Sequence, residues 1–416
     1  MRWMDFPFCI CGGWRLFLME VAYMAKFGIV ADDLTGATTV GVLLGRAGIS
    51  SAAFFDEKSI DTDKNYEAVI VNTDSRALPP EAARDCVRRA VRALKEDGTR
   101  YFSKRIDTTL RGGIGFEIDA MLDELPPDTV AVMVPAMPQS RRIVVGGYSV
   151  IDGTALSETP VAKDVRTPVT ESYIPALLEN QTKRKTGMIP LRAVLSGADA
   201  VADCIVKERR QEVEVFIVDA ISEEHVRRIA EAIVSLKWNV LAVDPGPFTE
   251  QLARARGFGH GERPELDGGE FGSAAGTVLV VSGSASPVTR KQMKYLMAQE
   301  GVASVSVSPV ALIDREKGTQ DEVMRVLKEA KKRLDRKNTS VLILETAVTS
   351  RSILLNELEK RLGLKPGEAA SHINNGLGQI VVALFSEAAD IFKGMYLTGG
   401  DTMVHVLKAL GAKGIE

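Results

Sequence analysis

Short apolar runs rich in Val and Ile recur along the chain, and they limit its fold more strongly than any other feature of the sequence. Helical stretches with one apolar face, such as residues 80–95 and 223–236, lie between several of these runs. Continuous apolar strands that alternate with amphipathic helices are typical of parallel sheets covered on both faces. We therefore predict an α/β fold with largely parallel sheets flanked by helices, with strands at residues 27–31, 68–71, 130–134, 215–218, 240–243, 278–281, 341–344 and 395–397.

The chain has 416 residues, which is more than one hydrophobic core usually supports, so two domains are expected. Residues 256–275 are rich in Gly and charge and poor in aliphatic side chains, as is typical of a linker. This linker separates a first domain at residues 24–255 from a second at residues 276–416. Residues 135–195 contain several Pro turns and little periodicity, which predicts a long functional excursion without regular elements.

The first 23 residues are apolar in two stretches, but Gly12, Gly13 and Arg15 interrupt them. Neither stretch reaches the roughly 18 apolar residues that a membrane span needs. Met24 directly precedes the first predicted strand, so we interpret Met24 as the true start and residues 1–23 as a mis-assigned extension. A cryptic signal peptide is the alternative.

The overall charge and composition exclude several classes of partner. Lys and Arg number 52 against 55 Asp and Glu, and the formal net charge of −3 lacks the basic excess that nucleic-acid binding needs. Aromatic residues make up 6% of the chain, too few to favour base-stacking platforms. The four scattered Cys disfavour a disulfide framework or a structural zinc site, and they favour a reducing, cytoplasmic setting. We expect neither nucleic acid nor a membrane as a partner, and the oligomeric state stays open, a homo-oligomer included.

Two adjacent carboxylates, Asp32 and Asp33, directly follow the first predicted strand and precede Leu34-Thr35-Gly36. Ligands of open α/β sheets bind in the crevice at the carboxyl ends of the strands. There the two carboxylates would accept hydrogen bonds from substrate hydroxyl groups, and one of them would act as a general base. The alternative is that they only cap the helix expected at residues 38–46.

Two further polar segments follow strands in the first domain. Arg76 ends the segment 72–76 and is suited to bind a carboxylate or a phosphate, with a solvated surface arginine as the alternative. Residues 104–115 combine three cations, one carboxylate and three glycines before a helix expected at residues 116–125. Glycines before a helix allow backbone N–H groups to face an anion. A plain basic turn is the alternative for this segment.

The second domain carries two strand-to-helix turns of small residues with hydrogen-bond donors. Residues 282–286 precede a helix expected at 289–299, and residues 398–402 precede one expected at 403–410. Each turn is suited to hold a phosphate, and the pair could clasp a nucleotide, although tight turns use the same residues for steric reasons. Residues 374–378 are interpreted as a further glycine turn.

Motifs that are missing from the sequence narrow the chemistry. The chain has no Gly-Lys dipeptide, so it has no Walker P-loop. Residues 376–381 lack the third glycine of a dinucleotide fingerprint, which disfavours an oxidoreductase of that fold. No Gly-x-Ser-x-Gly elbow occurs, so serine-hydrolase chemistry of that kind is not supported.

Six segments, in order along the chain, resemble motifs of the four-carbon acid sugar kinase family. They are residues 30–37, 104–112, 134–139, 146–148, 282–284 and 399–402. The resemblance extends from Met24 to the last residue. It implies an N-terminal acid-sugar-binding domain, a C-terminal nucleotide-binding domain and an active site in the cleft between them. It also implies ATP-dependent phosphorylation of the 4-hydroxyl group of a four-carbon sugar acid, with ATP and Mg²⁺ as cofactors.

The motif forms resemble the D-threonate and D-erythronate kinases more than the 3-oxo-tetronate kinases, which are the alternative. The resemblance implies a catalytic role for Asp32 or Asp33, between which the sequence does not choose. It implies that the sugar acid is bound by Asp32, Arg76, Lys104, Arg105, Ile106 and Asp107. It implies that ATP is bound by Ser282, Ser284, Gly399, Gly400, Asp401 and Thr402. No metal ligand is identified.

One feature departs from the family pattern. Family members usually continue past the Gly-Gly-Asp-Thr helix to a Lys-Ala-Gly-Gly-Phe-Gly-like turn that contacts ATP, whereas this sequence stops at Lys413-Gly414-Ile415-Glu416. We therefore expect the nucleotide-binding domain to lack its C-terminal segment. A sugar-acid-binding protein without catalytic activity is the alternative that this departure keeps open.

Overall fold

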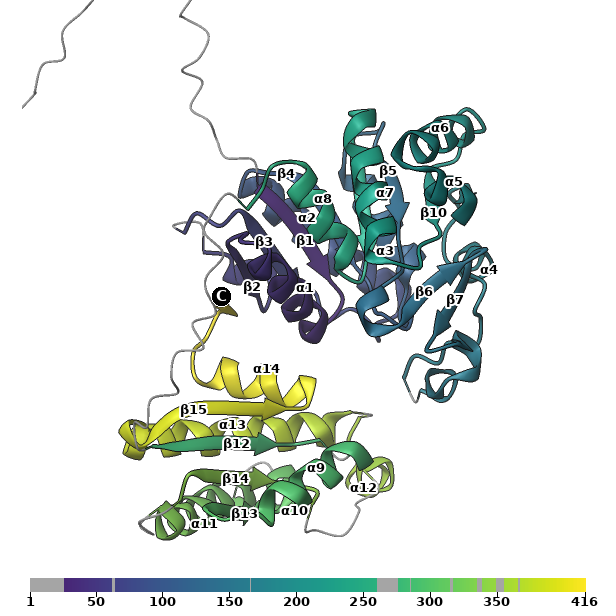
Figure 1. The fold of residues 1–416 in the computed structure, drawn as a ribbon. Helices are drawn as coiled ribbons and strands as arrows, with labels where there is room; N and C mark the ends of the chain where they lie inside the picture. The colour runs from purple at the N-terminus through teal and green to yellow at the C-terminus, as the bar shows by residue number, and fades with distance from the viewer. Residues whose placement is uncertain are drawn as a thin grey trace, which may run out of the picture.

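The computed structural model describes residues 26–61, 64–164, 166–259, 276–284, 286–314, 317–334, 339–348, 355–365 and 367–416. The predicted extension at residues 1–23, the start at Met24 and most of the predicted linker therefore lie outside the described residues. The α/β class with largely parallel sheets is confirmed (Figure 1).

The first unit is built on a large sheet whose strands run parallel, apart from an antiparallel strand at one edge. In spatial order the described strands are β16 (Gly414–Ile415), β2 (Ser51–Phe54), β3 (Ala68–Asn72), β1 (Lys26–Ala31), β4 (Thr99–Arg105), β11 (Val240–Asp244), β5 (Val130–Met133), β10 (Val215–Val218) and β9 (Thr186–Ile189). The central strands are buried along nearly their whole length, because helices cover the sheet on both faces.

The helices of this unit form two layers around the sheet. They are α1 (Leu34–Arg46), α2 (Pro80–Glu96), α3 (Ile114–Glu124), α4 (Ile174–Glu179), α5 (Leu191–Ser196), α6 (Ala198–Arg209), α7 (Glu223–Leu236) and α8 (Pro247–Ala255). Helices α1, α7 and α8 pack together on one face, and α2 and α3 pack together on the other (Figure 1). The predicted helices at 80–95 and 223–236 correspond closely to α2 and α7.

The excursion at residues 135–195 contains more regular structure than the sequence predicted, so that interpretation is corrected. Strands β6 (Arg142–Val145), β7 (Tyr148–Ile151) and β8 (Thr154–Ala155) form a small antiparallel sheet, and β9 joins the main sheet beside β10. The carboxylate of Asp219 accepts hydrogen bonds from the N–H groups of Gly146, Gly147 and Leu191 at 2.8, 2.9 and 3.0 Å. These elements depend on contacts with residues distant in sequence, which explains why local periodicity did not reveal them.

The second unit is built on a smaller parallel sheet. Its described strands, in spatial order, are β13 (Val302–Ser306), β14 (Val341–Glu345), β12 (Thr277–Ser282) and β15 (Phe392–Thr398). Its helices are α9 (Pro287–Met297), α10 (Pro309–Ile313), α11 (Lys317–Leu334), α12 (Leu355–Leu362), α13 (Glu368–Ala388) and α14 (Gly400–Ala409). Along β12, Leu279 and Val281 face the larger core under α11 and α13, whereas Val280 faces a small cluster with Met293 of α9.

Residues 374–378 lie inside helix α13, so the prediction of a further glycine turn is wrong. A Cβ on Gly376 would lie 2.6 Å from a side-chain carbon of Leu312, and a Cβ on Gly378 would lie 2.9 Å from Ala409 Cβ. The two glycines therefore allow α10 and α14 to pack closely against α13. In the sequence, glycines required for close helix packing look the same as glycines required for a turn.

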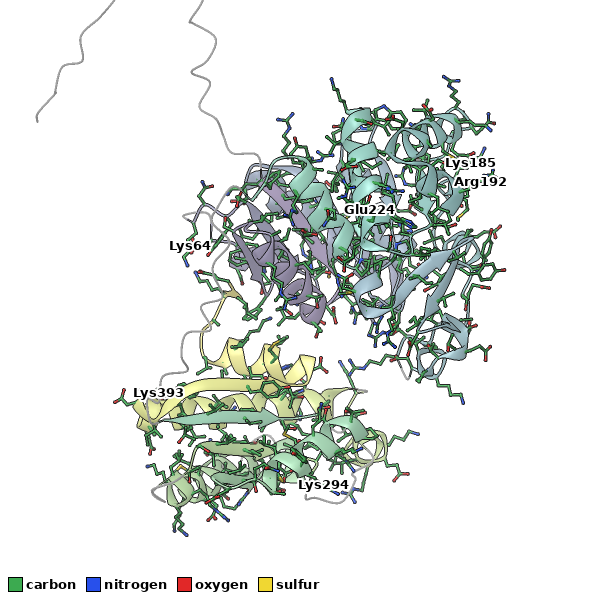
Figure 2. All side chains as sticks on the ribbon, viewed as in Figure 1. Lys64, Lys185, Arg192, Glu224, Lys294 and Lys393 are labelled. Atoms are coloured by element: carbon green, nitrogen blue, oxygen red, sulfur yellow. The ribbon has the colours of Figure 1, made fainter. Side chains whose placement is uncertain are left out.

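The last residues of the chain return to the first unit. Strand β16 pairs antiparallel with β2, and Phe55 N–H donates to the carbonyl of Lys413 at 3.1 Å. Glu416 forms an ion pair with Lys64, which is labelled at the edge of the first unit in Figure 2, and accepts a hydrogen bond from the Tyr66 hydroxyl group at 2.6 Å. Residues 414–416, predicted as part of the second domain, thus extend the sheet of the first.

Within the described part of the chain, no helix combines the length and the apolar character that crossing a bilayer would require.

Candidate active site

Most of the predicted site residues of the first unit lie where the chain changes direction across the main sheet. Strands β1 and β4 are neighbours, but the chain leaves β1 toward β2 and leaves β4 toward β5 on the opposite side. Loops that diverge from adjacent parallel strands leave a crevice at their carboxyl ends, which is the usual ligand site of such sheets. The loops after β1, β3 and β4 carry Asp32, Arg76 and Asp107 to this crevice.

Asp32 and Arg76 form a paired, largely buried contact at the end of β1. Arg76 Nε donates to one oxygen of Asp32 at 2.8 Å, and Arg76 Nη2 donates to the other at 3.0 Å. Burial alone would lower the pKa of Arg76, but the neighbouring carboxylates of Asp32, Asp107 and Asp33 outweigh burial and raise that pKa. Arg76 therefore stays charged and is held rigidly by two-pronged hydrogen bonding.

Asp33 has three partners and is more accessible than Asp32. Its Oδ1 accepts a hydrogen bond from Gly36 N–H at 2.8 Å, so Asp33 caps the start of α1. Its carboxylate also accepts hydrogen bonds from Arg76 at 2.7 Å and from Arg105 at 3.2 Å. The Asp33 side chain is 24% exposed against 5% for Asp32, which makes Asp33 the carboxylate that a substrate can reach.

Arg105 lies flat against the first turn of α1. A Cβ on Gly36 would lie 1.9 Å from Arg105 Nη1, so the arginine occupies the space that a side chain at position 36 would fill. The Nε atom of Arg105 is buried and has no hydrogen-bond partner among the described residues. A buried donor without a partner favours an acceptor from a bound ligand.

Asp107 connects a further arginine, Arg111, to Arg76 in the same crevice. Arg111 Nε donates to Asp107 at 2.7 Å, and Arg76 Nη2 lies 3.8 Å from the same carboxylate. Burial would raise the pKa of Asp107, but the hydrogen bonds from Arg111 and the charge of Arg76 hold it well below its usual range. Asp107 is therefore ionised at neutral pH and fixes the two guanidinium groups.

Lys104 lies beneath the crevice instead of lining it. Its Nζ is 2.6 Å from a carboxylate oxygen of Glu117, and both side chains are 1% exposed. The other oxygen of Glu117 accepts a hydrogen bond from the Ser75 hydroxyl group at 2.7 Å, beside Arg76. Ile106 is also buried, and its N–H donates to the Asp244 carbonyl at 3.0 Å. Lys104 and Ile106 are therefore buried behind the crevice, and their contacts with the substrate stay a prediction.

The predicted nucleotide residues of the second unit come together at the carboxyl ends of β12 and β15. Ser282 and Thr398 are paired neighbours in these strands, so the two turns that follow lie side by side. Ser282 Oγ is buried and has no hydrogen-bond partner among the described residues, which fits an acceptor supplied by a ligand. Thr402 is buried and donates to the amide oxygen of Asn374 at 2.8 Å, so it supports the turn from behind.

The glycines of this turn leave space that any other side chain would fill. Gly399 has φ +107°, a backbone conformation that L side chains rarely adopt, and a Cβ on Gly283 would lie 2.2 Å from Thr402 Oγ1. Helix α14 begins at Gly400, so Asp401 and Thr402 lie in its first turn and not before the helix as predicted. The Oγ atoms of Ser284 and Thr289 lie 3.3 Å apart at the start of α9.

The two groups of residues approach each other across the units. A Cβ on Gly400 would lie 3.4 Å from Thr35 Oγ1, in the first turn of α1. The N-termini of α1 and α14 are thus neighbours, and both direct backbone N–H groups and positive dipole ends outward.

A cavity of about 400 Å³ adjoins Arg76 on the side of α3. Its lining includes Arg76, Gly113 at the N-terminus of α3 and Arg166 from the excursion. Among the residues that the structure describes, no cluster of three or more acidic, His or Cys side chains is placed to hold a metal ion.

Sequence reasoning did not identify Glu117, Asn374 or Arg166. Glu117 lies within a helix whose pattern gave no signal beyond a polar residue at a buried position, and Asn374 lies in the segment interpreted from the sequence as a glycine turn. Arg166 lies in a stretch without apolar periodicity, and only the cavity that it lines distinguishes it.

Comparisons with known proteins match two domain families along the chain. A model of a sugar-binding N-terminal domain matches residues 27–252, and a model of a nucleotide-binding C-terminal domain matches residues 279–416. A D-erythronate kinase from Heliobacterium modesticaldum is 36% identical over 94% of this chain and 87% of its own length. A D-threonate kinase from Bordetella bronchiseptica is 31% identical over 93% of this chain and 86% of its own length.

A 3-oxo-tetronate kinase from Haemophilus influenzae is 30% identical over 64% of this chain and 63% of its own length. Among solved structures, a Salmonella typhimurium protein described as a putative tRNA synthase shares the fold, with a TM-score of 0.75, 21% identity and coverage of 94% of this chain and 89% of that one. A Bordetella bronchiseptica protein solved with bound citrate as a domain-swapped dimer has a TM-score of 0.50 at 27% identity, covering 94% of this chain and 86% of that one. The chain therefore belongs to the family of four-carbon acid sugar kinases.

Proposed function

We propose that this protein transfers the γ-phosphoryl group of ATP to the 4-hydroxyl group of D-erythronate or D-threonate. The observation that carries the proposal is the crevice at the ends of β1, β3 and β4, where Asp33 is accessible and held by Arg76 and Arg105. The similarity to a D-erythronate kinase and a D-threonate kinase over nearly the whole chain supports this choice of acceptor.

In this proposal Asp33 accepts the hydrogen bond of the reacting hydroxyl group and takes its proton, while Asp32 holds Arg76 in place. Asp33 is the better candidate because its side chain is more exposed than that of Asp32. Phosphoryl transfer depends mainly on alignment and charge neutralisation. The buried Nε–H group of Arg105, which has no hydrogen-bond partner among the described residues, and the backbone N–H groups at the start of α14 would face the transferred group and supply that neutralisation.

The phosphates of ATP would lie against the turns after β12 and β15. The Ser282 hydroxyl group, which has no hydrogen-bond partner in the described part of the chain, and the backbone N–H groups at the start of α14 would face them. Mg²⁺ would arrive with the nucleotide, since this ion is typically held by phosphate oxygens and one or two carboxylates. Asp401, exposed in the first turn of α14, is the carboxylate of that turn available to it. We propose that the cleft between the two units is the place where both ligands meet.

A 3-oxo-tetronate kinase is the second candidate, because a relative of that name also matches the chain. A sugar-acid-binding protein without turnover is the third. The domain-swapped dimer of a similar Bordetella protein makes a homo-oligomer the proposed assembly, which light scattering would test. A cytoplasmic location stays a prediction from the sequence.

A coupled ADP-release assay tests the proposal, with Mg-ATP and a panel of D- and L-erythronate, D- and L-threonate and 3-oxo-tetronate. Turnover with D-erythronate or D-threonate is expected, and turnover only with 3-oxo-tetronate would move the assignment to the second candidate. Silence across the panel, with sugar-acid binding still detected by calorimetry, would favour the binding protein.

The role of Asp33 is tested by Asp33→Asn, which keeps a good helix cap and removes the charge. We expect kcat to fall by roughly 10²-fold or more, the usual contribution of a positioned base. Asp85→Asn is the matched control, because Asp85 is exposed on α2 and is not one of the crevice residues. Equal kcat values for both variants would exclude Asp33 as the base.

A further inference from the structure

We propose that the cavity beside Arg76 binds the carboxylate group of the sugar acid, and that Arg166 is its counter-ion and sets the preference for an acid. This inference rests on the proposed function and adds to it a subsite and a specificity residue. It also revises the sequence expectation that Arg76 pairs with the substrate carboxylate.

Arg76 is poorly placed to bind a further carboxylate. All three of its guanidinium nitrogens already donate to Asp32 or Asp33. The surrounding charges are balanced as well, since the arginines at positions 76, 105 and 111 face the aspartates at positions 32, 33 and 107. A substrate carboxylate in the crevice itself would therefore meet no excess positive charge.

Arg166 has the free positive charge that Arg76 lacks. It lines the cavity of about 400 Å³, and none of the described carboxylates lies within ion-pair distance of it. Its charge reaches the edge of the crevice, because it lowers the pKa of Asp74 in the loop after β3, against the stronger raising effects of desolvation and of Asp401. The acidic residue of the cavity lining, Glu171, accepts a hydrogen bond from Tyr173 N–H at 2.7 Å.

The backbone around the cavity also favours an anion. Gly113 is the N-cap of α3 and supplies no capping side chain, so the helix N-terminus is open at this residue, whereas Gly115 N–H is already bound by Gln181 Oε1 at 2.8 Å. Gly112 has φ +91°, and a Cβ there would lie 3.2 Å from the Arg76 carbonyl oxygen, so the backbone borders the cavity without a side chain in between. The positive end of the α3 dipole thus adds to the charge of Arg166.

This placement explains why the terminal hydroxyl group would be the one that reacts. In a four-carbon acid the carboxylate and the 4-hydroxyl group are at opposite ends of the chain. With the carboxylate in the cavity beside Arg76, the hydroxyl end of the acid extends toward Asp33. Asp33 precedes Thr35 by two residues, and Thr35 lies close to Gly400 at the start of α14. Arg166 and Asp33 would then define the two ends of the acceptor site.

The test is Arg166→Gln in the full chain, compared with Arg141→Gln as a matched control. Arg141 is an exposed arginine of the same excursion, paired with Asp152 and not part of the cavity lining. For Arg166→Gln we expect KM for D-erythronate to rise at least tenfold, while KM for ATP and kcat at saturation stay within twofold. Arg141→Gln should match the wild type, and Arg166→Lys should recover part of the loss because it restores the charge.

A neutral acceptor distinguishes the loss of carboxylate binding from general damage to the site, because general damage would lower the phosphorylation of acid and neutral acceptors alike. The wild type should prefer D-erythronate strongly over erythritol, which has the same carbon count but no carboxylate. In Arg166→Gln, kcat/KM for D-erythronate should fall while kcat/KM for erythritol stays unchanged, so that most of the preference is lost. An unchanged KM for D-erythronate, or a preference that survives the substitution, would overturn the inference.

Failure of the inference and failure of the proposed function are distinguishable by direct binding. Calorimetric titration of D-erythronate into both proteins does not require turnover, and we expect at least tenfold weaker binding to Arg166→Gln. Equal binding by both proteins overturns the inference even if the kinase is active. A wild type that binds and phosphorylates none of the acids overturns both.

Discussion

Gly36 shows how a single residue controls the geometry of the acceptor site. A Cβ at this position would lie 1.9 Å from Arg105 Nη1 and 2.4 Å from its Cζ, so any side chain displaces the guanidinium group. That group in turn holds Asp33, at 3.2 Å. The glycine is required by this close approach and not by the helix, which it weakens.

Gly36→Ala is therefore expected to raise KM for the sugar acid at least tenfold while leaving the protein folded. Gly45→Ala in the same helix is the control, because nothing lies within 4 Å of a Cβ at that position. The control should leave KM unchanged and raise the free energy of unfolding by roughly 0.5–1 kcal/mol, the usual gain from Gly to Ala in a helix. Steady-state kinetics and urea unfolding measure both effects, and equal KM values for the two variants would contradict the steric argument.

Asp107 makes stability depend on pH in a defined direction. Its pKa in the folded state lies well below the unfolded value, chiefly because Arg111 and Arg76 outweigh the effect of burial. A depressed carboxyl pKa contributes stability above the unfolded value of about 4, and that contribution is lost as the pH falls toward the folded value.

We therefore expect the urea midpoint of the wild type to fall between pH 6 and pH 3 more steeply than that of Asp107→Asn. Asp152→Asn, at an exposed ion pair with Arg141, should keep the wild-type slope. Midpoints measured by circular dichroism at several pH values decide the matter. The same slope for Asp107→Asn and the wild type would show that other groups carry the acid sensitivity.

At the scale of elements, the contact between β4 and α3 supports the floor of the crevice. Lys104 from the strand and Glu117 from the helix form an ion pair whose side chains are 1% exposed. Removing one partner of a buried pair leaves the other charge without compensation. Glu117 also accepts the hydrogen bond of Ser75, so the loop that carries Arg76 depends on it.

Glu117→Gln should lower the free energy of unfolding by about 3 kcal/mol or more, the range found for broken buried pairs. The double variant Lys104→Met/Glu117→Leu should recover most of that loss, because it removes both charges. Glu124→Gln, which breaks the exposed pair of α3 with Arg92, should cost much less. Urea unfolding compares the three, and a double variant less stable than the single one would contradict the argument.

The start of α14 shows what local sequence patterns miss at this scale. Apolar periodicity predicted a helix at residues 403–410, yet the helix begins at Gly400 and includes Asp401 and Thr402. The extra turn is stabilised by Thr402, whose hydroxyl group donates to Asn374 on α13. Since that partner is 28 residues away, the periodicity of the helix itself carries no trace of it.

At the scale of the whole molecule, the two units are joined by the pairing of β16 with β2 as well as by the chain between them. A Cβ on Gly414 would lie 2.6 Å from the Ala53 carbonyl oxygen, so the pairing requires glycine at this position. Without β16, strand β2 would have a neighbouring strand, β3, on one side only. Its outward N–H and C=O groups would then be open to other chains.

Gly414→Val is expected to release β16 and expose the edge of β2. Backbone amides of β2 and of Phe55, which donates to Lys413, should exchange hydrogen faster by mass spectrometry. Lys413→Ala is the control, since it keeps the backbone carbonyl and removes only an exposed side chain. Unchanged exchange in Gly414→Val would mean that β16 contributes little to the protection of this edge.

The sequence by itself determined the fold class and the segments that carry the site. Continuous apolar runs and amphipathic helices depend on a side chain's own polarity and on its near neighbours, so β1, β3, α2 and α7 were predictable with their approximate bounds. The polar segments after these strands were predictable for the same reason, because residues that end a buried strand reach solvent at one edge of the sheet.

Only the tertiary structure decided which charges pair and which stay free. Asp32 and Arg76 are 44 residues apart, and Ser75 and Glu117 are 42 apart, so their contacts follow from the order of strands in the sheet. The same packing buries Lys104, ties Arg76 to two aspartates and leaves Arg166 beside a cavity, without an ion-pair partner among the residues that the structure describes. A sequence lists the charged groups, but their partners depend on distances that only the packed chain sets, and the free energy of a charge depends on those partners.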